Sequence, residues 1–219
     1  MPKATLSFKL SNETGATFGF GPYHWTVWKL VDGQWYRIGP RMAPDLGAIL
    51  DSGGSYTWNL AIDITNLVRS IDGQQSEQDI TLPGLGGGTY AFGIDGLFQG
   101  QKYDNGTGAA TRFELVGDSL SLTPMDDLQV VSRDGDEKHV RASQANTAYL
   151  ATRVENPNAE TTRKIPEQVI RLTPIRNLLA SFEDGVSQVR LDGRDTYFGN
   201  STLLIEYEGS TYRIETEKD

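Results

Sequence analysis

One glycine-rich stretch of the sequence, from Leu82 to Phe98, has the residue types that phosphate-binding loops use. Gly86, Gly88 and Ala91 fit the loosest dinucleotide-binding pattern, in which alanine replaces the third glycine. That chemistry needs a strand before the glycines and a helix after them, because the N-terminus of the helix holds the pyrophosphate. Here the residues that follow, Tyr90 to Ile94, alternate between large and small side chains, which is typical of a strand. We therefore expect the glycines to lead into a strand, and we predict no bound cofactor.

Residues that bind metals or act as nucleophiles are sparse. The chain has no cysteine, which excludes thiolate catalysis and cysteine-ligated metal sites. Its two histidines, His24 and His139, are expected to have structural roles in or beside strands. Asp134 and Asp136 have the spacing that opens a calcium loop, but the twelfth position is Ala145, where that loop needs a bidentate glutamate. With no G-x-S-x-G element either, the sequence predicts no catalytic residue and no metal ligand.

Tryptophan is concentrated in the first sixty residues, at positions 25, 28, 35 and 58. Buried tryptophans fill a core, whereas exposed ones stack on sugars or anchor a protein partner. Successive side chains in a strand point to opposite faces, and Trp25 and Trp28 stand at an odd and an even position. One of them therefore faces outward if the strand is regular. We take Trp25, Trp28 and Tyr103 as candidate contacts, and the expected partner is another protein or a surface glycan.

Three asparagines lie in N-x-S/T sequons, namely Asn12, Asn105 and Asn200. All three fall in predicted turns or loops, where a glycosylated asparagine must lie. They are candidates for N-glycosylation, which would suit an archaeal surface protein better than a cytoplasmic enzyme.

The charge balance narrows the classes of partner. The chain carries 29 acidic and 20 basic residues, a formal net charge of −9, and no basic run interrupts this excess. Nucleic acid and anionic membrane surfaces would be repelled. No stretch approaches the roughly 18 apolar residues that a membrane span needs, and the N-terminus has no apolar signal region. The protein is therefore either cytoplasmic or a mature form from which a signal or lipid anchor has been removed.

The first half reads as short strands. Residues 5–11, 56–62 and 109–116 are typical strand segments, and Asp32-Gly33 predicts a tight hairpin turn. Residues 40–54 are expected to form a long loop. Seven or eight short strands and no helix indicate an antiparallel β-sandwich over residues 1–117.

Six elements of this half follow one another in a fixed order. They are LSFKLSNET, TFGFG, GQWY at 33–36, GSYTW at 54–58, LPG with GTY between 82 and 90, and FEL at 113–115. With these elements, residues 4–117 resemble the immunoglobulin-like domains of bacterial and archaeal envelope proteins and lipoproteins. The resemblance implies a binding or spacer module with no catalytic residues to carry over. The chain departs from the pattern around residues 62–81 and 97–107.

The second half, residues 118–219, predicts a small α+β domain. Strands are expected at LSLTP, at LQVVS and HVRAS around Gly135, at AYLATRVE and VSQVRL, and in a hairpin folded at Glu208-Gly209. A helical segment is expected near 166–183, with Thr173 as an N-cap and a buried apolar stripe. The stripe consists of Ile175, Leu178, Leu179 and Phe182.

Three functions remain open from the sequence. The preferred one is a non-catalytic cell-envelope or secreted protein that acts in binding, adhesion or surface assembly. The second is a soluble inhibitor that inserts a sandwich loop, such as Gln99–Gly108, into a partner enzyme. The third is an enzyme with a site around Glu167, Arg171 and Arg176, although the polar face of a helix explains these residues equally well.

Overall fold

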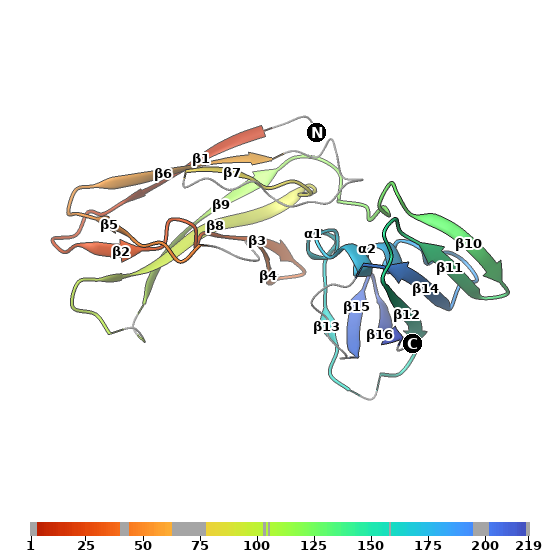
Figure 1. Ribbon diagram of the computed structural model, residues 1–219. Coiled ribbons are helices and arrows are strands. Elements are labelled where there is room, and N and C mark those ends of the chain that lie inside the picture. The colour runs from red at the N-terminus through yellow and green to blue at the C-terminus, as the bar shows by residue number, and fades with distance from the viewer. Residues whose placement is uncertain are drawn as a thin grey trace. The chain divides into compact units, whose positions relative to one another are not determined.

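The computed structural model describes residues 4–39, 44–62, 78–102, 104, 106–157, 159–194 and 202–217. The fold is mainly β, as predicted, and the chain divides into two compact units (Figure 1). The boundary between the units lies between Leu120 and Ser121, whereas the sequence placed it after Gly117. No helix of the described residues is long and apolar enough to cross a membrane.

The N-terminal unit consists of two sheets. The smaller sheet has the order β1-β6-β7, and the larger has the order β4-β3-β8-β2-β5, with β9 paired to β8. The described pairings are antiparallel except for β6 with β7. The sequence missed β5, which lies inside the expected loop at 40–54. The strands are β1 (Ala4–Ser11), β2 (Phe18–Phe20), β3 (Thr26–Val31), β4 (Gln34–Gly39), β5 (Ala48–Leu50), β6 (Ser55–Ile62), β7 (Asp79–Thr81), β8 (Gly88–Phe98) and β9 (Thr107–Leu115).

An aromatic core joins the two sheets. Phe8 of β1 stacks on Phe92 of β8 with ring centroids 4.3 Å apart, and Trp58 of β6 lies 5.7 Å from the same ring. These side chains are buried because alternate residues of each strand face the other sheet. The unit is therefore a β-sandwich, visible as two layers in Figure 1.

Tight turns close the hairpins where the sequence expected them. Asp32 and Gly33 have φ of 50° and 78° between β3 and β4. Two consecutive positive φ angles are what a two-residue hairpin loop requires, and glycine adopts them without steric cost.

The glycine-rich stretch leads into a strand, as predicted, and its glycines allow a close backbone approach. β8 begins at Gly88. A Cβ added to Gly87 would lie 2.0 Å from the carbonyl oxygen of Gly117, and one added to Gly86 would lie 2.3 Å from the nitrogen of Leu120. The Gly87 N–H donates to the carbonyl of Asp118 at 2.7 Å. The stretch packs against the end of its own unit rather than forming a phosphate cradle.

The C-terminal unit is a seven-stranded sheet with the order β10-β11-β14-β12-β16-β15-β13. β11 pairs with β14 in parallel, and β13 with β15 likewise, while the other pairs are antiparallel. The strand expected at LSLTP does not form, since residues 121–124 are irregular. The elements are β10 (Gln129–Asp134), β11 (Glu137–Arg141), β12 (Thr147–Val154), β13 (Thr162–Arg163), α1 (Pro166–Val169), α2 (Thr173–Leu179), β14 (Gln188–Gly193), β15 (Leu203–Tyr207) and β16 (Ser210–Glu217).

Helix α2 covers one face of this sheet. Ile175, Leu178 and Leu179 are buried in a core with Val189 and Leu191 of β14, as the apolar stripe predicted. The N-cap prediction was wrong: the capping position is Leu172, and no side chain caps the helix.

A buried arginine on α2 holds the beginning of the unit. The Arg176 Nε donates to the carbonyl of Thr123 at 2.7 Å, and its Nη1 lies 3.3 Å from the Met125 sulfur. The neighbouring Asn177 accepts a hydrogen bond from the Met125 N–H at 2.9 Å. Since residues 121–124 form no strand, α2 provides hydrogen-bond partners that a sheet would otherwise supply.

Replacing Gly87 with alanine tests the close approach at residues 117–120. We expect Gly87→Ala to lower the free energy of unfolding of the N-terminal unit by about 2 kcal/mol, because backbone must move to admit the methyl group. Thermal unfolding followed by near-UV circular dichroism measures this. Gly15→Ala is the control, because a Cβ there meets nothing within 4 Å. Equal stability of the two variants would contradict the constraint.

Replacing Arg176 with methionine tests the buried contact. We expect Arg176→Met to destabilise the C-terminal unit by about 2–3 kcal/mol, because the carbonyl of Thr123 loses its buried donor. Urea unfolding provides the measurement. Arg133→Met is the matched control and should cost less than about 1 kcal/mol, because the Arg133–Glu183 pair is 46% exposed on both sides.

Candidate functional site

The outer face of the larger N-terminal sheet carries two tryptophans. In β3, Val27 and Lys29 point into the sandwich and are buried, so Trp28 between them points outward and is half-buried. In β4, Tyr36 is buried, and Trp35 points to the outer face with 39% of its surface exposed. Strand pairing sets both positions, because the antiparallel register fixes which side chains share a face.

Arg112 of β9 completes this surface. Register places Trp28 opposite Ala91 of β8, and Ala91 opposite Arg112. The Arg112 guanidinium carbon lies 5.4 Å from the centroid of the Trp35 ring, within the range of a cation–π interaction. We call Trp28, Trp35 and Arg112 the tryptophan platform.

Small residues form the base of the platform. The Trp28 ring lies over Gly93, where an added Cβ would come within 2.8 Å of the ring and 3.0 Å of the Ala109 carbonyl oxygen. Ala91 is buried beside it. The ring can therefore lie close to the sheet and leave its outer side accessible.

The three residues predicted as partner contacts lie in different environments. Trp25 is only 1% exposed and stacks on Phe92 inside the core, so its assignment as a contact was wrong. Trp25 has the same parity as the inward-facing Val27 and Lys29, so the expectation that only one of the two tryptophans faces outward is confirmed, and that one is Trp28. Trp28 does reach the outer face, whereas Tyr103 lies outside the described residues. Of the loop expected at 99–108, Thr107 and Gly108 belong to β9, which pairs with β8 from Gly96 with Thr107 onward.

Asn12 has a structural role that conflicts with glycosylation. Its side chain is buried, and its Nδ2 donates to the carbonyls of Ala16 at 2.8 Å and Leu50 at 2.9 Å. Its Oδ1 accepts from the N–H and the hydroxyl of Thr14. Both amide hydrogens are used, so the folded chain leaves no place for a glycan on Asn12. The other two sequon asparagines, Asn105 and Asn200, lie outside the described residues.

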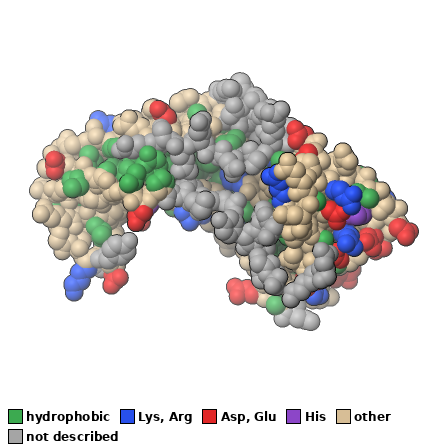
Figure 2. Space-filling view, viewed as in Figure 1, with side chains coloured by type: hydrophobic (Ala, Val, Ile, Leu, Met, Phe, Trp, Pro, Cys, Tyr) green, Lys and Arg blue, Asp and Glu red, His purple; other side chains and the backbone are tan. Residues whose placement is uncertain are grey.

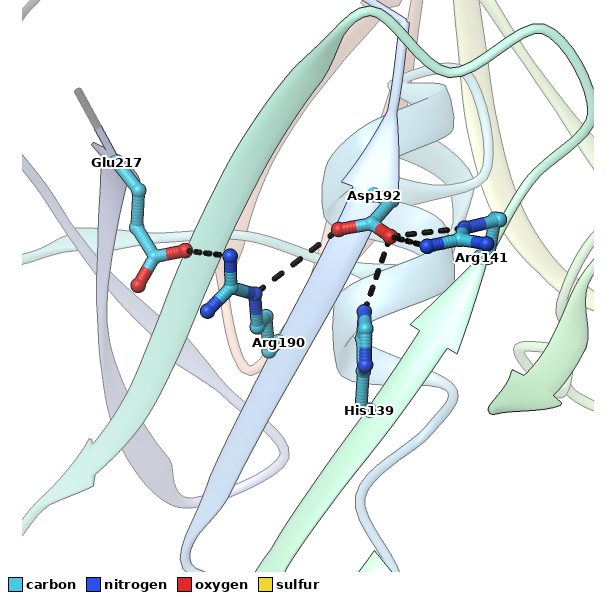
Figure 3. Close-up of polar contacts among 5 residues, drawn as sticks. All are labelled: His139, Arg141, Arg190, Asp192 and Glu217. Atoms are coloured by element: carbon cyan, nitrogen blue, oxygen red, sulfur yellow. Dashed lines mark hydrogen bonds and ion pairs between the residues drawn. The ribbon is translucent and has the colours of Figure 1, made fainter. Parts of the chain in front are cut away.

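A charged cluster forms on the C-terminal sheet, on the face opposite the core (Figure 3). Parallel pairing places His139 beside Arg190 and Arg141 beside Asp192. The Asp192 Oδ2 accepts from Arg141 Nε and Nη2 at 2.8 and 2.7 Å, and it lies 3.1 Å from His139 Nε2. Arg190 pairs with Glu217 at 3.1 Å and lies 3.9 Å from Asp192 Oδ1. This cluster was not predictable from the sequence, because only the parallel pairing of two strands distant in the chain creates it.

Asp192 is ionised more readily than an ordinary aspartate. Burial raises its pKa, but the hydrogen bonds from Arg141 and the nearby His139 outweigh burial and hold the pKa below the usual value. The cluster is therefore organised around a stable carboxylate.

The residues considered for an enzyme site do not form a polar surface. Glu167 and Arg176 are fully buried, and Arg171 donates to the Glu167 carbonyl. Burial lowers the pKa of Arg176, and nearby Asp126 partly offsets this. The expectation of an exposed polar helix face was wrong for Glu167 of α1 and Arg176 of α2, because both side chains are enclosed in the unit, whereas Arg171 is half-buried. The described residues hold no group of three or more histidine, aspartate or glutamate side chains placed to bind a metal ion.

Replacing Asp192 with asparagine tests the charged cluster. The folded-state pKa lies below the unfolded value of about 3.9, so ionisation stabilises the fold above about pH 4 and is lost as the pH falls through the folded pKa. We expect Asp192→Asn to cost about 1 kcal/mol at pH 7 and much less near pH 3. Urea unfolding at both pH values measures the difference, with Glu137→Gln, at an exposed position of β11, as the control. A cost that does not change with pH would show that the charge is unimportant.

Comparison with protein-family models, with curated proteins and with solved structures finds no match to this chain. The resemblance of the first half to immunoglobulin-like envelope domains therefore stays a prediction from the residues.

Proposed function

We propose that this is a non-catalytic cell-envelope or secreted protein that binds surface glycans through the tryptophan platform. The observation that supports it is the exposed Trp35 ring, with the Arg112 guanidinium 5.4 Å from its centroid, on the outer face of the sheet. A sugar ring has an apolar C–H face that packs on an indole, and hydroxyl groups at its edge that need hydrogen-bond partners. The platform offers both kinds of contact.

The platform is shaped for a ligand that lies flat. Trp28 and Trp35 come from the adjacent strands β3 and β4. Beside β3, Ala91 and Gly93 of β8 have small side chains or none, so nothing bulky protrudes from the sheet there. The rim is polar, because Arg112 and Glu114 of β9 are both exposed. A tryptophan side chain has only two rotatable bonds to fix when a ligand stacks on it, so the loss of conformational entropy is small.

Aliphatic surface on the same unit favours a second candidate, assembly with another protein. Hydrophobic side chains gather on the N-terminal unit in the space-filling view (Figure 2). Leu46 and Ile49 are exposed by 56% and 74%, and β5, which carries Ile49, is at the edge of its sheet. An exposed apolar side chain on a sheet edge suits a protein partner.

A polysaccharide-binding experiment tests the platform. Isolated envelope polysaccharide of the source organism is titrated into the protein, and tryptophan fluorescence is followed. We expect Trp35→Ala to weaken binding about tenfold or more, equivalent to about 1.4 kcal/mol, through loss of the stacking surface. Arg112→Ala should weaken it less, because the ring remains.

Ile49→Ser is the matched control, since it removes an exposed apolar side chain elsewhere on the same sheet. Unchanged binding by Trp35→Ala would refute the platform, and loss of binding only in Ile49→Ser would place the polysaccharide on the aliphatic surface instead. The location is tested independently by fractionating native cells and measuring the intact mass of the protein. Recovery from the cytosol alone would refute an envelope or secreted location.

A further inference from the structure

The C-terminal unit contains a groove of about 690 Å³ beside the charged cluster. Its floor includes Arg190 and Asp192 of β14 and Ala148 of β12, and the segment 142–147 lines one side. The volume lies in the range of small-molecule sites. Three of the lining residues, Ala142, Ala145 and Ala148, have small side chains, which leaves the groove open.

The segment beside the groove is held at both ends. The Ala142 N–H donates to the Asp192 carbonyl at 2.9 Å, and the Asn146 N–H donates to the Gly193 carbonyl at 2.8 Å. Between them, Gln144 has a φ of 59°, a left-handed conformation that few side chains adopt without cost. The groove is therefore already ordered in the free protein, so binding a ligand does not cost the conformational entropy of ordering this segment.

Hydrogen-bond donors are available on the floor. Arg141 uses Nε and Nη2 to bind Asp192, and Arg190 uses Nη2 to pair with Glu217. Among the described residues, the Nη1 group of neither arginine makes a hydrogen bond or an ion pair. Because both side chains line the groove and are about half exposed, these N–H groups can reach a ligand.

An acceptor lies on the same groove. Asp127 lines it, and its Oδ2 accepts from the N–H of Ser143 at 3.1 Å and from the Ser143 hydroxyl. These bonds fix the carboxylate, and its Oδ1 makes no hydrogen bond within the described residues. Donors and a fixed acceptor in one groove suit hydroxyl groups, each of which both donates and accepts.

The charges in the groove cancel. Arg141 and Arg190 contribute two positive charges, and Asp127 and Asp192 contribute two negative ones. An anion or a cation would gain little net attraction, whereas a neutral polyol can satisfy the paired donors and acceptors. We propose that this groove is a second binding site, separate from the tryptophan platform, and that it takes a short neutral oligosaccharide. Two sites on one chain would allow bivalent attachment to a glycan-covered surface.

Nuclear magnetic resonance of the full chain tests the proposal. Cellotetraose, maltotetraose and chitotetraose are each added at about 10 mM, enough to occupy a site with a Kd of about 1 mM. Inorganic phosphate is the anionic probe. We expect at least one sugar, and not phosphate, to shift the amide signals of residues 142–148. Ala145→Trp, which fills the groove without touching an ion pair, should abolish these shifts.

Two arginine variants complete the test. Arg190→Ala should weaken sugar binding about tenfold, and Arg213→Ala should not change it. Arg213 is a matched control because it lies in the same sheet and pairs with a glutamate, but it does not line the groove. The proposal is overturned if no sugar shifts residues 142–148, if phosphate alone does, or if Ala145→Trp leaves the shifts intact. Shifts confined to the Trp28 and Trp35 indoles would support the platform and refute the groove.

Discussion

Burial of one face of each main sheet is the constraint on which both proposed sites depend. In the N-terminal unit, Tyr90 and Phe92 of β8 fill the core, which leaves Ala91 and Gly93 on the outer face under the platform. In the C-terminal unit, Val189 and Leu191 of β14 pack in the core with α2, so the alternate residues of that strand face away from it. A shift of one residue in either register would exchange these faces, and the cost of exposing the core prevents it.

The C-terminal unit holds charged side chains in two different ways, one buried and one at the surface. Arg176 is completely buried and donates to the backbone carbonyl of Thr123, so its role is to hold residues 123–125. Asp192 is partly exposed and is surrounded by side chains that keep it ionised. The first arrangement contributes to the fold and is costly to break, whereas the second leaves N–H groups for other molecules.

The two proposed sites recognise different parts of the same class of ligand. The platform offers indole rings to the apolar face of a sugar, and the groove offers donors and acceptors to its hydroxyl groups. Binding at each site alone is expected to be weak, because neither buries a ligand deeply. Attachment through both would be stronger than through either one, provided that the ligand reaches both. The net charge of −9 restricts this to surfaces that are not strongly anionic.

Local sequence determined the elements, and tertiary structure determined the sites. Alternation predicted the strands from 5–11 to 109–116, and positive-φ turn residues such as Asp32-Gly33 and Glu208-Gly209 located hairpins, because these signals act between neighbours in the chain. The apolar stripe of α2 was predictable for the same reason. The burial of Asn12 and Arg176 was not predictable, since contacts with Leu50 and Thr123, distant in the sequence, bury them, and only the fold decides that Trp25 rather than Trp28 is the buried tryptophan. Likewise, only the pairing of β11 with β14 brings Arg141 to Asp192, and only the order β4-β3-β8-β9 brings Arg112 to Trp35.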